Sequence, residues 1–88
     1  MLEITPGIKQ KLEYGYMDRD DIGNAYQRFI RRDWGNISKE DEKVNKESIK
    51  KGGAILGIYY SKEDLEFWII REVVKGEWVT TVILPEEY

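Results

Sequence analysis

The sequence predicts an α+β fold, in which a three-stranded antiparallel meander in the C-terminal third packs against two helices that precede it. Apolar residues recur at helical spacing between positions 22 and 30, and residues 39–51 are polar and bounded by capping residues. Residues 54–84 hold three runs rich in aromatic and β-branched side chains. With 88 residues the chain suits a single domain, residues 1–88.

The N-terminal segment leaves one or two additional short strands open. Residues Leu2 to Thr5 alternate weakly between apolar and polar, which predicts a short strand that Pro6 and Gly7 end. Within Ile8 to Met17 the pattern is ambiguous, but apolar and aromatic residues alternate there, so a second short strand is compatible with it.

The first helix is predicted from Asp21 to Arg32. Asp20 and Asp21 offer an N-cap and a favourable negative charge at its start, and Gly35 or Asn36 can adopt the left-handed conformation after its end. The apolar residues that define this helix are spaced at i, i+4, i+7 and i+8, and they are Ile22, Tyr26, Phe29 and Ile30.

The second helix is predicted from Lys39 to Lys51. Ser38 and Asp41 form a variant capping box at its start, and Gly52 follows its end. We expect this helix at the periphery of the domain, because its large apolar residues are few and lie on different sides, Val44 and Ile49.

Three strands are predicted in the C-terminal third. Ala54 to Tyr60 is apolar on both faces, which is typical of a central, covered strand. A four-residue hairpin loop leads to Leu65–Arg71, a turn follows at Val73–Glu77, and the strand Trp78–Leu84 ends at Pro85.

Both faces of the predicted sheet carry large apolar side chains. Leu65, Phe67 and Ile69 point to one side, and Trp68 and Ile70 point to the other. Two helices can cover one face, so the second face requires the N-terminal segment, a second copy of the chain or a partner protein.

Composition excludes several classes of chemistry. The chain has no Cys and no His, which removes disulfides, thiolate nucleophiles, Ser-His-Asp catalysis and the commonest metal ligands. We therefore expect a non-enzymatic protein without a metal or cofactor. No signal peptide or membrane-spanning run is recognisable, so a cytoplasmic location is the expectation.

Charge is distributed unevenly along the chain. The formal net charge is −3, and residues 54–88 alone hold three basic and seven acidic residues. This acidic third disfavours non-specific binding to a nucleic-acid backbone there.

Two groups of motifs resemble a known family. The first comprises Asp33-Trp34-Gly35-Asn36-Ile37, Glu40-Asp41, Asn45 and Gly52-Gly53, and the second comprises Phe67-Trp68-Ile69-Ile70, Glu72 and Thr80-Thr81-Val82-Ile83-Leu84-Pro85-Glu86-Glu87-Tyr88. Over residues 29–88 they resemble the uncharacterised plasmid-related small proteins of bacterial plasmids and integrative elements. The resemblance implies a mobile-element context and a bacterial origin, and it brings no activity with it.

The sequence therefore predicts a macromolecule-binding accessory protein of a bacterial mobile element, with a protein partner or a homodimer favoured. Its aromatic residues exceed what a core of this size easily hides. The candidate binding residues lie in the motifs above, and they are Asp33, Trp34, Glu40, Asp41, Asn45, Trp68, Glu72, Thr80 and Thr81.

Two alternatives remain open. Arg28, Arg31 and Arg32, with Trp34 nearby, could meet phosphate and a stacked base, which defines a nucleic-acid-binding alternative. The acidic last third and the mobile-element resemblance together suggest an anti-restriction or anti-CRISPR inhibitor.

Overall fold

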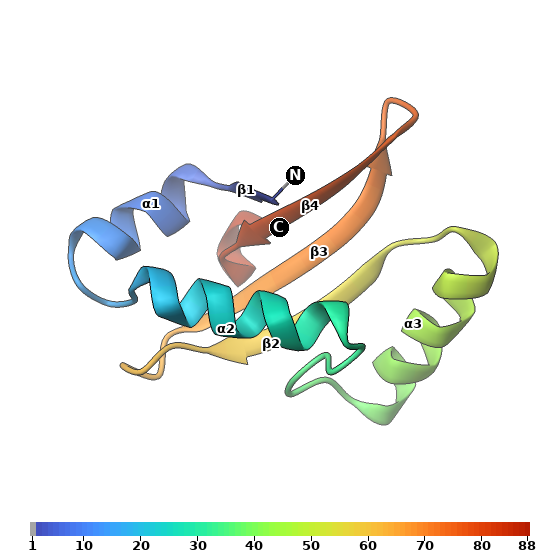
Figure 1. The fold of residues 1–88 in the computed structure, drawn as a ribbon, viewed down its shortest axis with the longest axis horizontal. Coiled ribbons are helices and arrows are strands. Elements are labelled where there is room, and N and C mark those ends of the chain that lie inside the picture. The colour runs from blue at the N-terminus through green and yellow to red at the C-terminus, as the bar shows by residue number, and fades with distance from the viewer. Residues whose placement is uncertain (1) are drawn as a thin grey trace.

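The computed structural model describes residues 2–88, which form an α+β domain (Figure 1). A mixed sheet lies behind two of the helices, and the third helix flanks one edge. In chain order the elements are β1 (Leu2–Ile4), α1 (Pro6–Glu13), α2 (Arg19–Ile30), α3 (Lys39–Lys51), β2 (Ile55–Tyr60), β3 (Glu66–Val74), β4 (Glu77–Ile83) and the 3-10 turn η1 (Pro85–Glu87). Within residues 2–88, no helix has the length and apolar character needed to cross a membrane.

The sheet has the strand order β1-β4-β3-β2. β2, β3 and β4 form the predicted antiparallel meander, with Ile58 opposite Trp68 and Ile70 opposite Thr81. β1 adds a fourth strand parallel to β4, with Glu3 opposite Thr81. The short N-terminal strand predicted at Leu2 to Thr5 is therefore confirmed, and it makes the sheet mixed.

The second N-terminal strand considered within Ile8 to Met17 is wrong, because this region contains helix α1. Thr5 caps the helix by accepting a hydrogen bond from the Ile8 amide, and Pro6 occupies the first turn, where its missing N–H is not needed. The alternation was misleading because two of its aromatic residues, Tyr14 and Tyr16, are 67% and 53% exposed.

Helix α2 begins two residues earlier than predicted. Asp18, rather than Asp20 or Asp21, is its N-cap, and it exchanges hydrogen bonds of 2.9 Å with Asp21 in a capping box. The helix ends at Ile30, and Arg32 then adopts a left-handed conformation with φ 64°.

Helix α3 has the predicted bounds. The Ser38 hydroxyl accepts a hydrogen bond of 3.0 Å from the Asp41 amide, and Gly52 ends the helix in the left-handed conformation. Its outer surface is polar, and Val44 is 59% exposed. The peripheral position of α3 is therefore confirmed.

Strand β2 lies at an edge of the sheet, which corrects the predicted central position of Ala54–Tyr60. Along this edge, Asn45 and the backbone around Trp34 pair with β2, as a neighbouring strand would. The Asn45 amide donates to the Leu56 carbonyl oxygen over 2.8 Å and accepts from the Leu56 N–H over 3.0 Å. Beside it, the Ile58 N–H donates to the Trp34 carbonyl oxygen over 2.9 Å, and the Asn36 N–H donates to the Ile58 carbonyl oxygen over 2.8 Å. These bonds satisfy backbone groups that an edge strand usually leaves to water.

Strands β3 and β4 extend further than predicted, which corrects the turn expected over Val73–Glu77. Only Lys75 and Gly76 form the turn, both with positive φ, 52° and 81°. Residues 72–79 therefore form a two-stranded arm that projects beyond the paired parts of β1 and β2 (Figure 1).

The two faces of the sheet are covered differently. On the front face, against the helices, Tyr59, Phe67, Ile69 and Val82 are at most 2% exposed and pack with residues of α1 and α2. On the back face, Ile70 is 3% exposed, and Tyr88 after the C-terminal turn lies against Trp68. The N-terminal segment, considered as a cover for this second face, instead adds β1 at an edge and brings Ile8 into the front core.

Candidate functional site

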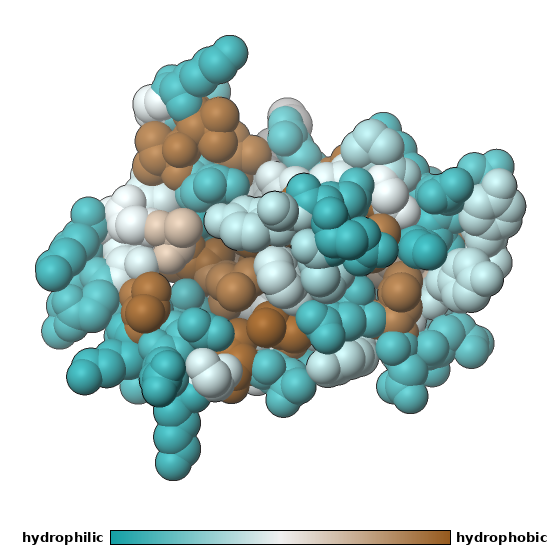
Figure 2. All heavy atoms as spheres, turned by 180° about the vertical axis from the view of Figure 1, so that it is seen from behind, coloured by the Kyte–Doolittle hydropathy of each residue, from teal (hydrophilic) through white to brown (hydrophobic). Residues whose placement is uncertain are grey.

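The back face of the sheet combines apolar and acidic side chains. Alternation and register place these residues on it: Glu3, Leu56, Ile58, Tyr60, Glu66, Trp68, Ile70, Glu72, Val74, Glu77, Val79, Thr81 and Ile83. Figure 2 views the molecule from behind and shows apolar side chains over the arm and across the middle, separated by polar groups.

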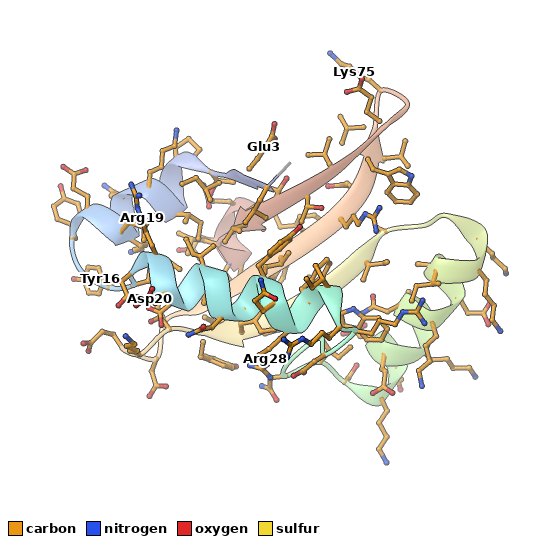
Figure 3. All side chains as sticks on the ribbon, viewed as in Figure 1. Glu3, Tyr16, Arg19, Asp20, Arg28 and Lys75 are labelled. Atoms are coloured by element: carbon orange, nitrogen blue, oxygen red, sulfur yellow. The ribbon has the colours of Figure 1, made fainter. Side chains whose placement is uncertain are left out.

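All charged strand residues on the back face are glutamates. The four strands hold four acidic residues, and all four lie on this face: Glu3, Glu66, Glu72 and Glu77. The strands hold one basic residue, Arg71, which lies on the front face opposite Ile55 and Thr80. Glu3 extends outward from β1 (Figure 3).

Trp68 is held in place near the middle of the back face. Its indole N–H donates to Glu66 Oε2 over 2.9 Å, and Tyr88 meets the ring edge-on with centroids 5.9 Å apart. Tyr60 donates to Glu66 Oε1 over 3.4 Å and accepts a hydrogen bond of 3.1 Å from Asn36. Trp68 is thus a half-buried, oriented aromatic side chain.

The fold brings three of the predicted binding residues onto one face. Trp68, Glu72 and Thr81 all point to the back, whereas Thr80 points to the front beside Arg71. Asp41 reaches the border of the same face, where it lines a small cavity of about 150 Å³ together with Ile70 and Tyr88.

The remaining predicted residues serve the fold or lie apart. Asn45 is 2% exposed and is committed to the edge of β2. Glu40 is exposed in the first turn of α3. Trp34, predicted as a surface aromatic, is 6% exposed and belongs to the core. It was misjudged because the sequence does not reveal that its own backbone pairs with β2 and draws the indole inward.

Asp33 organises the loop after α2. Arg28 binds it through Nε over 2.8 Å and through Nη2 over 3.3 Å, and the Gly35 N–H donates to it over 3.2 Å. The hydrogen bonds from Arg28 and Gly35 hold the pKa of Asp33 below its usual range. Tyr59 donates to the Asp33 carbonyl oxygen over 2.8 Å, and its burial raises its pKa.

These contacts make two of the residues considered for nucleic-acid binding unavailable. Arg28 is paired with Asp33, and the buried indole of Trp34 is inaccessible to a stacked base. Arg31 and Arg32 remain exposed. Two cationic side chains are few for binding a nucleic-acid backbone, whose contacts normally involve several Lys and Arg residues.

Sequence reasoning missed Glu3, Glu66 and Glu77 as members of the site. Part of the pattern is visible in the sequence. Alternate residues of one strand point to the same face, and these are Glu66, Trp68, Ile70 and Glu72. The register between strands, which is not visible in one sequence, is what adds Glu3 and Glu77. Within residues 2–88, no group of three or more acidic side chains is arranged to hold a metal ion.

No protein-family model, curated protein or solved structure matches this chain.

Proposed function

We propose that this chain is a non-enzymatic protein-binding domain, and that its partner docks on the back face of the sheet. The observation that carries the proposal is the composition of this face, on which half-buried apolar side chains lie among strand residues whose charged members are all glutamates. An apolar centre with a charged rim is the usual anatomy of a protein interface.

The acidic residues at the rim of the back face determine the charge expected on the partner's surface. Glu3, Glu72 and Glu77 pair with no cation within residues 2–88, so they are free to meet Lys or Arg side chains of another protein. A nucleic-acid backbone would be repelled here. Two copies joined back to back would bring these like charges together, which disfavours that homodimer. The partner is therefore a different protein with a basic rim around an apolar patch.

Trp68 is the expected energetic centre of this contact. Tryptophan is enriched among the residues that dominate binding, and Glu66 and Tyr88 already fix the orientation of its ring. Little conformational freedom is then lost when a partner covers it.

The biological setting is part of the proposal. The motif resemblance supports a bacterial mobile element, in which an accessory protein acts on host or element proteins. An inhibitor of a restriction or CRISPR nuclease would be one such protein, since enzymes that bind nucleic acids have basic surfaces.

Affinity capture from a bacterial lysate with matched charge variants tests the proposal. Glu3→Lys combined with Glu72→Lys reverses the rim, and Glu63→Lys combined with Glu13→Lys makes the same charge change at exposed positions outside the back face. We expect the wild type and the second pair to retain the same protein, and the rim pair to lose it at least tenfold. Hydrogen exchange of the purified complex should protect β3 and β4.

Two results would overturn the proposal. One is equal retention of the captured protein by both variant pairs. The other is a solution mass showing a wild-type dimer that the rim pair dissociates, because the face would then be occupied by a second copy.

A further inference from the structure

A groove on the front face has the opposite electrostatic character. It lies where the ends of α2 and α3 approach the arm, encloses about 360 Å³, and is lined by residues that include Tyr26, Arg32, Ile49, Arg71, Trp78 and Thr80. None of its lining residues is acidic, although the chain holds 17 Asp and Glu. The groove is therefore cationic in a protein of net negative charge.

Arg71 is positioned in this groove without a carboxylate partner. Its guanidinium carbon lies over the Trp78 ring, 4.9 Å from the centroid, and its N–H groups make no ion pair within residues 2–88. An arginine held beside an aromatic ring without an ion-pair partner is suited to bidentate binding of a carboxylate.

Arg32 adds a second free guanidinium group at a backbone position that favours glycine. Its φ of 64° lies in the left-handed region, where a side chain with a Cβ is strained. Arg32 makes no ion pair within the described residues, so its guanidinium group is free to bind an anion.

Apolar side chains surround the opening of the front-face groove. Ile30, Ile49 and Trp78 are 55%, 37% and 48% exposed, and they surround a floor that contains the buried Phe29 and Trp34. Exposed apolar side chains beside two unpaired arginines call for a ligand that combines an apolar group with negative charge.

We propose that this groove binds an acidic peptide segment of a partner protein, with one large apolar side chain on the aromatic floor and a neighbouring Asp or Glu between Arg32 and Arg71. The volume suits one anchoring side chain. Two cations suit one or two carboxylates better than the phosphates of a nucleic-acid strand. The proposal is independent of the back face, and together the two surfaces would make the chain a connector between two partners.

Selection from a random peptide library displayed on phage, with the wild-type chain immobilised, tests this proposal. We expect enriched sequences that place Asp or Glu next to Leu, Ile, Phe or Trp. The most enriched peptide, labelled for fluorescence anisotropy, should bind Arg71→Gln and Arg32→Gly about tenfold more weakly than the wild type. Arg31→Gln is the matched control, since Arg31 adjoins Arg32 but does not line the groove.

Thermal unfolding separates lost binding from lost folding. Arg32→Gly removes the strained Cβ, so its melting temperature should equal or exceed that of the wild type while peptide binding falls. The rim pair Glu3→Lys with Glu72→Lys should bind the peptide as the wild type does, so failure of the back-face proposal and failure of this one are distinguishable.

The proposal would be overturned by enrichment of basic or uncharged peptides only, or by equal peptide affinity for the groove variants and Arg31→Gln. It would also be overturned if the wild type enriched no peptide above the level seen with the double variant Arg32→Gly with Arg71→Gln. Adenosine monophosphate is the comparison ligand. If it alone shifts the Trp78 indole signal in a nuclear magnetic resonance titration, the groove is a small-anion site and the peptide assignment is wrong.

Discussion

The two faces of the sheet differ in burial and composition because side chains alternate along the same strands. Phe67 and Trp68 are neighbours in β3, yet the first is 0% exposed in the helical core and the second lies half-buried on the back. The front face holds the domain together and leaves a cationic groove at one end. The back face holds half-buried apolar and acidic side chains beside the buried Ile70, and we propose the main binding surface there.

The largest predicted effect is the loss of stability in Phe67→Ala, which should exceed that in Trp68→Ala. Phe67→Ala should lower the free energy of unfolding by about 3–5 kcal/mol, because it opens a cavity in the closed front core. Trp68→Ala should cost only about 1–2 kcal/mol, because part of its surface is already in water. Urea unfolding followed by circular dichroism measures both values.

If the two variants lowered the free energy of unfolding by similar amounts, the two faces of the sheet would contribute equally to stability. A small domain has a total stability of about 5–15 kcal/mol, so Phe67→Ala is expected to populate the unfolded state measurably. If Trp68→Ala did the same, Trp68 would be a core residue rather than a binding residue.

The next largest loss of stability is expected at the edge strand β2. Asn45→Ala should lower the free energy of unfolding by about 1–3 kcal/mol, because the Leu56 N–H and carbonyl oxygen lose their partners. Val44→Ala is the matched control on the same helix, and at 59% exposure it should change stability by less than about 0.5 kcal/mol. Hydrogen exchange at the Leu56 amide should accelerate in the first variant only.

Unchanged exchange at Leu56 would show that water replaces the Asn45 side chain without cost. The pairing of Asn45 with the edge of β2 would then contribute little to the stability of the sheet.

Sequence reasoning succeeded where the signal was local. The limits of α3 follow from Ser38 and Gly52, whose capping depends on residues within a few positions. The antiparallel meander follows from short connections between β-rich runs.

Sequence reasoning failed where distant segments decide the outcome. Nothing local indicates that Asn45 would bond to Leu56, so β2 looked like a central strand. The Trp34 indole is buried because the following backbone pairs with Ile58, 24 positions away from it in the sequence. Likewise, only the register gathers four glutamates on one face.

The smallest expected effect concerns Glu87, which joins the C-terminal turn to the start of α1. Its carboxylate accepts hydrogen bonds from the Thr5 hydroxyl over 2.6 Å, the Leu84 N–H over 2.9 Å and the Gly7 N–H over 3.0 Å. Burial alone would raise the pKa of Glu87, but these hydrogen bonds outweigh it and hold the pKa below its usual range. Because the folded-state pKa is depressed, the stabilisation is present above the unfolded pKa of about 4.3 and is lost as pH falls through the folded value.

Glu87→Gln should therefore cost about 1 kcal/mol at pH 7, a modest value because the site is exposed to solvent. The difference from the wild type should shrink below about pH 4 and vanish once the wild-type carboxyl is protonated. Urea unfolding at a series of pH values measures this, with Glu86→Gln as the exposed neighbouring control. A cost that persists unchanged at low pH would mean that the shape of the side chain, rather than its charge, links the turn beside the back face to the helix on the front.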